Sequence, residues 1–140
     1  MNSVKGKFPV KILVVDDNLL NRKLACAVLR GNKIEYDTAE NGKIAFEKYL
    51  TGEFSLILMD IQMPIMNGIE STIKIREHES KSGLLGSIPI IAVTTFTMSS
   101  DKKNCFEAGM NEILGKPYKT ENLIEMISRF ISLEEISGEK

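Results

Sequence analysis

The sequence has few of the residues that most metal and covalent sites use. Among its 140 residues it has two cysteines, Cys26 and Cys105, and a single histidine, His78. Zinc sites need several such ligands, and nucleophilic sites need a positioned base, so neither class of site is expected. The cysteines show neither pairing nor metal-ligand spacing. We predict that they are reduced helix residues in a cytosolic compartment and that His78 lies on the surface.

Long apolar runs and charge excess are also missing. No apolar stretch approaches the roughly 20 residues that span a bilayer, and the first ten residues lack the apolar core of a signal peptide. The net charge is −1 and the basic residues are scattered, so there is no basic field for nucleic acid. These absences predict one cytoplasmic domain that touches neither nucleic acid nor membrane directly.

What the chain does have is a series of continuous apolar runs, which is typical of parallel strands buried on both faces. The clearest run, Phe54–Met59, leads straight into Asp60 and then into turn residues at Pro64 and Asn67-Gly68. The other predicted strands are Val10–Val15, Ile34–Ala39, Ile88–Val93 and Asn111–Leu114.

Helical spacing and capping residues fill the intervals between these strands. They predict helices from Asn18 to Gly31, from Asn41 to Gly52, from Gly68 to about Glu79, over 101–108, and from Thr120 to about Ile131. The apolar stripe of the first helix is predicted to be Leu20, Leu24, Ala27 and Val28, and that of the last helix Leu123, Ile124, Ile127, Phe130 and Ile131.

This alternation predicts an α/β fold of (βα)₅ type. It would be a doubly wound, parallel five-stranded sheet of order 2-1-3-4-5 inside a three-layer sandwich of the flavodoxin kind. We expect the domain to occupy residues 10–132, with a lead-in over 1–9 and a tail or linker over 133–140.

Polar residues stand at the carboxyl ends of four predicted strands. They are Asp16-Asp17, Asp60, Thr94 and Lys116. Each has an ordinary explanation alone, such as a helix N-terminal acid, a turn cap, strand propensity or a loop. In a sheet of order 2-1-3-4-5, however, all four positions meet at one crevice, where such folds bind ligands.

Three carboxylates at one crevice repel one another unless a proton or a cation is bound. Oxygen ligands without histidine or cysteine favour a hard cation, most naturally Mg²⁺. Asp60 would then be a carboxylate nucleophile for a phosphoryl group, with Thr94 and Lys116 available to the phosphoryl oxygens.

Four sequence motifs carry a specific resemblance. They are Ile-Leu-Val-Val-Asp16-Asp17-Asn, Leu-Met-Asp60-Ile-Gln-Met-Pro-Ile-Met-Asn-Gly, Ile-Pro-Ile-Ile-Ala-Val-Thr94 and Ala-Gly-Met-Asn-Glu-Ile-Leu-Gly-Lys116-Pro. Over about residues 10–132 the chain resembles the receiver domains of two-component response regulators, most closely those attached to hybrid sensor histidine kinases.

The resemblance implies a phosphorelay role. Asp60 would take phosphate from a phosphohistidine on a histidine kinase or phosphotransfer protein, and Thr94 and Lys116 would bind the phosphoryl group. Asp17, Asp60 and the Gln62 carbonyl would bind Mg²⁺ directly, with Asp16 acting through water.

By the same resemblance we expect a cis Lys116-Pro117 bond and partner docking on the first helix near Asn18, Leu19 and Arg22. We also expect a weak dimer through the helix over 101–108 and the last helix, and a parent chain that is a hybrid kinase. The domain would catalyse its own phosphotransfer and dephosphorylation, which leaves its status as an enzyme open.

Two positions depart from the receiver pattern. Ile113 stands three residues before the strand-end lysine, where receivers carry a switch aromatic, so coupling between Thr94 and an aromatic is not expected. Thr95 replaces the usual small residue after the switch threonine and is expected to narrow access to Asp60.

Three other functions remain open from the residues. A haloacid-dehalogenase-like phosphatase would also use a strand-end aspartate, but its general acid would stand at Gln62, which cannot donate that proton. A flavodoxin-type protein would place phosphate against Asp16-Asp17, which repel it. A scaffold module would keep the fold without phosphorylation.

Overall fold

The computed structural model describes residues 10–83, 86–95 and 99–132, and for Ser99 and Ser100 the backbone alone. In these ranges five strands alternate with five helices. The strands are β1 (Lys11–Val15), β2 (Glu35–Ala39), β3 (Leu56–Met59), β4 (Ile90–Thr94) and β5 (Glu112–Gly115). The helices are α1 (Leu19–Gly31), α2 (Gly42–Tyr49), α3 (Gly68–Lys81), α4 (Ser99–Ala108) and α5 (Thr120–Ser128). The predicted lead-in over 1–9 and tail over 133–140 lie outside the described residues.

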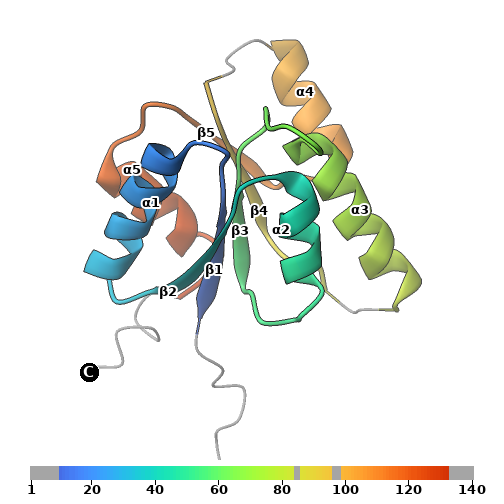
Figure 1. The fold of residues 1–140 in the computed structure, drawn as a ribbon, viewed down its shortest axis with the longest axis horizontal. Coiled ribbons are helices and arrows are strands. Elements are labelled where there is room, and N and C mark those ends of the chain that lie inside the picture. Colours follow the sequence, from blue (N-terminus) through green and yellow to red (C-terminus); the bar gives the residue numbers. More distant parts are fainter. Residues whose placement is uncertain (1–9, 84–85, 96–98, 133–140) are drawn as a thin grey trace, which may run out of the picture.

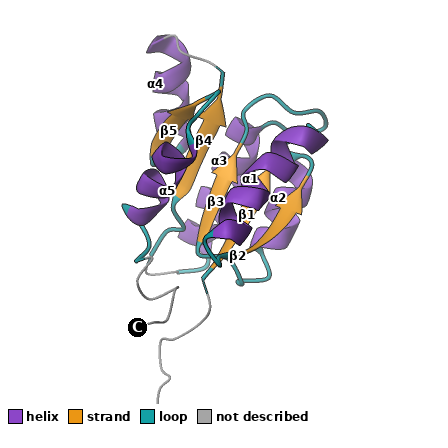
Figure 2. Ribbon diagram, turned by 90° about the vertical axis from the view of Figure 1, so that its left-hand side faces the viewer, coloured by secondary structure: helices purple, strands orange, loops and turns teal. Residues whose placement is uncertain are grey.

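Every strand pair is parallel, and the sheet order is β2-β1-β3-β4-β5, which confirms the predicted fold. Figure 1 shows α1 and α5 on one face of the sheet and α2, α3 and α4 on the other. The turned view in Figure 2 shows the same three layers. Right-handed crossovers between parallel strands produce this arrangement.

The core is divided by the sheet into two apolar clusters. Successive residues of β1 point to opposite faces, so Ile12 and Val14 pack toward α1 and α5, while Leu13 and Val15 pack toward α2, α3 and α4. The strands β1, β3 and β4 are buried along almost their whole length. This explains why they lack polar alternation in the sequence.

Several element ends differ from the predicted ones. The strand β3 starts at Leu56 rather than Phe54, and β4 starts at Ile90 because the preceding Pro89 has no N–H to donate. Helix α3 continues to Lys81, beyond the predicted end near Glu79.

The predicted apolar face of α1 is wrong except at Val28, which is half-buried and packs against the core. Leu20 and Leu24 are 63% and 56% exposed. The same helical spacing fits two neighbouring stripes, and the helix buries the one with the smaller side chains. The buried residues of α1 are Ala25, Cys26 and Leu29.

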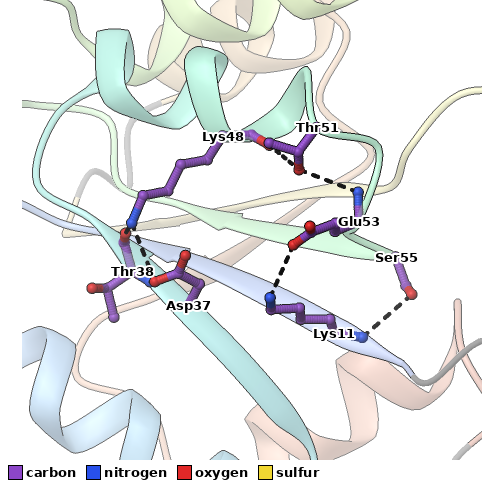
Figure 3. Close-up of polar contacts among 7 residues, drawn as sticks. All are labelled: Lys11, Asp37, Thr38, Lys48, Thr51, Glu53 and Ser55. Atoms are coloured by element: carbon purple, nitrogen blue, oxygen red, sulfur yellow. Dashed lines mark hydrogen bonds and ion pairs between the residues drawn. The ribbon is translucent and has the colours of Figure 1, made fainter.

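Helix α2 is fixed to the edge strand β2 by charged contacts (Figure 3). The Lys48 Nζ donates to the Thr38 carbonyl at 2.6 Å and lies 3.1 Å from the Asp37 carboxylate. On the neighbouring strand, the Lys11 Nζ pairs with Glu53 at 3.1 Å. The Lys48 ammonium lies beside the outer strand β2, where unpaired backbone groups would otherwise invite further strands.

The scarce residues have structural roles. Cys26 and Cys105 are free, as predicted, and both are buried. His78 is half-buried rather than on the plain surface, because its ring packs edge-on against the Tyr49 ring at 5.7 Å. Among the described residues, no helix has the length and apolar character needed to cross a membrane.

Candidate functional site

Asp16, Asp60 and Lys116 directly follow β1, β3 and β5, and backbone hydrogen bonds extend the sheet to each of them. The Asp16 N–H donates to the last carbonyl of β2 at 3.1 Å, and the Asp60 N–H donates to the last carbonyl of β1 at 2.9 Å. The Lys116 N–H donates to the carbonyl of Thr94, the last residue of β4, at 2.8 Å. The sheet therefore brings the predicted residues together at its carboxyl edge.

Three carboxylates meet at this edge. Asp16, Asp17 and Asp60 each offer an oxygen, and these oxygens all lie within 4.8 Å of one another. Asp16 is 6% exposed and Asp60 is 9% exposed, whereas Asp17 is exposed to solvent. Backbone N–H groups hold the two buried side chains: Asn18 donates to Asp16 at 2.9 Å, and Ile61 donates to Asp60 at 2.8 Å.

Lys116 lies among these acids rather than on a loop surface. Its Nζ is 2.8 Å from the Asp16 Oδ2 and 3.6 Å from the Asp60 Oδ1. The peptide bond between Lys116 and Pro117 is cis, as predicted. One lysine against three carboxylates leaves the cluster with excess negative charge.

The pKa of Asp60 shows the effect of that excess. Burial of the carboxyl, followed by the nearby Asp16 carboxylate, raises this pKa from 3.8 to about 6, against the opposing attraction of Lys116. The ionised form of Asp60 is therefore costly near neutral pH unless a further cation is present.

The chemistry of the donor set fits a hard divalent cation. The three clustered side chains offer only carboxylate oxygens. Mg²⁺ prefers such oxygen ligands, whereas softer metals prefer nitrogen or sulfur. Gln62 is exposed on the loop that follows Asp60. The expected contribution of its carbonyl to a metal site stays a prediction.

Gly68, predicted as a turn residue at the start of a helix, also lies against the backbone of the carboxylate cluster. A Cβ at this position would lie 2.0 Å from the Asp60 carbonyl oxygen, so no side chain fits without moving the loop. The Gly68 N–H also donates to the Ile61 carbonyl at 2.8 Å. The start of α3 thus packs directly on the backbone that carries Asp60.

The two unusual positions lie in different surroundings. Ile113 is half-buried and packs against the core cluster beneath α2, α3 and α4. Thr95 is exposed, whereas Thr94 is buried, with 3% of its surface exposed. The expected narrowing of access to Asp60 by Thr95 stays a prediction.

An apolar cavity of about 510 Å³ lies beside this polar cluster. It opens between α1 and the loop that joins β5 to α5, and Lys116 and Thr95 lie at its polar side. Its walls include Leu24, Val28, Val93 and Tyr118. Apolar surface therefore continues from the exposed face of α1 to the edge of the carboxylate cluster.

Comparison with known proteins supports one family. The family of response regulator receiver domains matches residues 12–128. The chain is 42% identical over 131 residues to hybrid signal transduction histidine kinase B of Dictyostelium discoideum. That match covers 87% of this chain but only 7% of the kinase, so the chain spans a small part of this relative.

Two solved structures have the same fold. The first is the receiver domain of Ssk1 from Saccharomyces cerevisiae, crystallised with the histidine phosphotransfer protein Ypd1. It has a TM-score of 0.83 and 31% identity, and the match covers 87% of this chain and 88% of that chain. The second is the receiver domain of a sensor histidine kinase from Pseudomonas aeruginosa, with a magnesium ion in its active-site cleft. It has a TM-score of 0.77 and 32% identity, covering 87% of this chain and 97% of that one.

Proposed function

Because the chain belongs to the response regulator receiver domain family, and is thus a receiver of two-component signalling, we propose that Asp60 accepts a phosphoryl group from a phosphohistidine. One observation carries this proposal: Asp16, Asp17, Asp60 and Lys116 converge at the carboxyl edge of the sheet. In its simplest form, an Asp60 carboxylate oxygen attacks the phosphorus, the P–N bond breaks, and its electron pair returns to the imidazole nitrogen.

The surrounding side chains position the incoming group. Lys116 is placed to bind phosphoryl oxygens by releasing part of its contact with Asp16, and the Thr94 hydroxyl is a donor at the end of the adjacent strand. Asp17, Asp60 and the Gln62 carbonyl would hold Mg²⁺ directly, with Asp16 binding through water. When bound, Mg²⁺ would neutralise negative charge on the carboxylates and the phosphoryl oxygens.

We propose a histidine phosphotransfer protein or a histidine kinase as the partner, docked on the outer face of α1. This face carries the exposed residues Leu19, Leu20 and Leu24, at 56%, 63% and 56% exposure. Exposed apolar side chains gathered next to a polar site are typical of a protein interface. Coverage of this face would also exclude water from the carboxylate cluster.

The wider context is also a proposal. The domain would act on the cytoplasmic side, without direct contact with membrane or nucleic acid, as part of a hybrid kinase or of an Ssk1-type regulator. A weak dimer through α4 and α5 is expected. Because Ile113 stands where receivers carry the switch aromatic, we propose that phosphorylation does not act through a threonine–aromatic pair and that the signal leaves the domain through another surface.

A transfer assay tests this function. The protein is mixed with a phosphorylated histidine phosphotransfer protein and Mg²⁺, and the label on each protein is followed by gel. Transfer should occur to wild type and not to Asp60→Asn. Leu20→Asp should slow transfer, while Leu50→Asp, an equally apolar and 48% exposed residue after α2, should not. Binding of the donor without any transfer would instead favour a scaffold.

A further inference from the structure

Helix α1 carries a cation in its first turn and no acid there. This placement is unfavourable, because the positive end of the helix dipole lies at that turn. The residue is Arg22, which is half-buried, and its Nη1 donates to the Asp16 carbonyl at 2.7 Å. A charge-assisted bond of this length offsets the unfavourable position.

The carbonyl that Arg22 binds belongs to the peptide group joining Asp16 to Asp17. The Asp16 side chain has its own supports, from the Asn18 N–H at 2.9 Å and the Lys116 Nζ at 2.8 Å. The Asp17 side chain is different. It is exposed, and none of the hydrogen bonds or ion pairs found among the described residues involves it.

The position of the Asp17 carboxylate therefore depends on its backbone. The planes of the two peptides on either side of Asp17 together set the direction of its Cα–Cβ bond. The Asn18 N–H, which donates to the Asp16 side chain at 2.9 Å, holds the peptide after Asp17, so the restraint still needed is on the plane of the peptide before it. Arg22 supplies that restraint from α1, whose start is itself held by the Asn18 cap on the Asn21 N–H at 2.9 Å. We infer that Arg22 is a positioning residue, which orients Asp17 for metal binding through the Asp16–Asp17 peptide. This inference rests on the proposed function, in which Asp17 is a metal ligand.

The direction in which Mg²⁺ affinity changes when Arg22 is removed distinguishes a positioning role from a purely electrostatic one. If Arg22 acted only as a nearby cation, its removal would strengthen binding of Mg²⁺, because repulsion would be lost. If it positions Asp17, removal weakens binding in spite of the lost repulsion. Groups that orient metal ligands typically contribute about 10-fold or more to metal affinity.

The test measures Mg²⁺ affinity in four proteins from the amide chemical shifts of residues around the site. Arg22→Ala should weaken binding by about 10-fold, and Arg22→Lys, which keeps a charged donor, should recover part of the loss. Lys23→Ala is the matched control, because it removes the same charge from the exposed neighbouring position on α1 and should leave affinity unchanged. In metal-free protein, hydrogen exchange at the Asn18 amide should be faster in Arg22→Ala than in Lys23→Ala.

Unchanged or tighter Mg²⁺ binding in Arg22→Ala would overturn the inference while leaving the proposed function intact. Failure of wild type to bind Mg²⁺ would overturn the proposed metal site and this inference with it. Thermal unfolding of each variant checks that it is folded, so that a loss of Mg²⁺ affinity is not caused by a loss of structure. An Arg22 variant also alters the backbone at Asp16 and Asp17, so docking of the phosphodonor protein on α1 is better tested by substituting the exposed leucines of that helix.

Discussion

Replacing Asp60 by asparagine should stabilise the metal-free protein at neutral pH. The carboxyl is 9% exposed, and burial together with Asp16 raises its pKa from 3.8 to about 6. Between these two pH values the unfolded chain releases a proton that the folded chain keeps, so the stability of wild type falls as pH rises. The shift corresponds to about 3 kcal/mol once pH is above about 6.

Asparagine avoids this cost because it does not titrate. It also keeps an oxygen to accept from the Ile61 N–H, and Lys116 keeps its 2.8 Å contact with Asp16. In EDTA at pH 7.5, the free energy of unfolding of Asp60→Asn should exceed that of wild type by about 2–3 kcal/mol. The gain should shrink as pH falls through 6 and disappear below about 4.

Urea denaturation of both proteins at several pH values measures this difference in unfolding free energy directly. The dependence of that free energy on urea concentration should have the same slope in the two proteins. Glu47→Gln, on the exposed face of α2, is the control and should change stability little. Added Mg²⁺ should stabilise wild type and reduce the difference, since a ligand of the folded state raises its stability. Equal stability of Asp60→Asn and wild type in EDTA at pH 7.5, or a gain that persists at pH 4, would refute the reasoning.

Three further substitutions test other contacts of the fold. Ile65 is 78% exposed with φ of 72°, so Ile65→Asn should raise the free energy of unfolding by about 1 kcal/mol in urea denaturation. Gly68→Ala should lower it by about 3 kcal/mol and slow phosphorylation by acetyl phosphate, because the new Cβ meets the Asp60 carbonyl. Arg76→Met should lower it by about 3 kcal/mol at pH 7, because the Glu79 carboxylate, which is 7% exposed and lies 2.8 Å from the Arg76 Nη1, would stay buried without this ion-pair partner.

The sheet and the cluster of polar residues at its carboxyl edge could be predicted because their signals are local. An apolar run that ends in an acid, as at Asp60, defines both a buried strand and the group at its carboxyl end. The order of strands then follows from general rules for parallel sheets, and it brings Asp16 and Lys116 to the same edge. No long-range contact had to be known to predict this cluster.

What could not be predicted depends on distances between segments. The spacing of apolar residues in α1 fits two faces, and only the position of the helix on the sheet decides that Leu24 is exposed and Leu29 buried. The need for glycine at 68 arises from the close approach of the Asp60 backbone. The bond from Arg22 to the Asp16 carbonyl depends on how a long side chain turns back along its helix.

The central claim is that Asp60 is a metal-dependent phosphoacceptor. Its most direct test is the intact mass of the protein after incubation with acetyl phosphate and Mg²⁺, alongside Asp60→Asn and a sample in EDTA. We expect wild type to gain one phosphoryl group and both controls to gain none. Where the acyl phosphate hydrolyses quickly, beryllofluoride should still bind wild type with Mg²⁺. A phosphoryl group on Asp60→Asn, or neither phosphorylation nor beryllofluoride binding in wild type, would contradict the account.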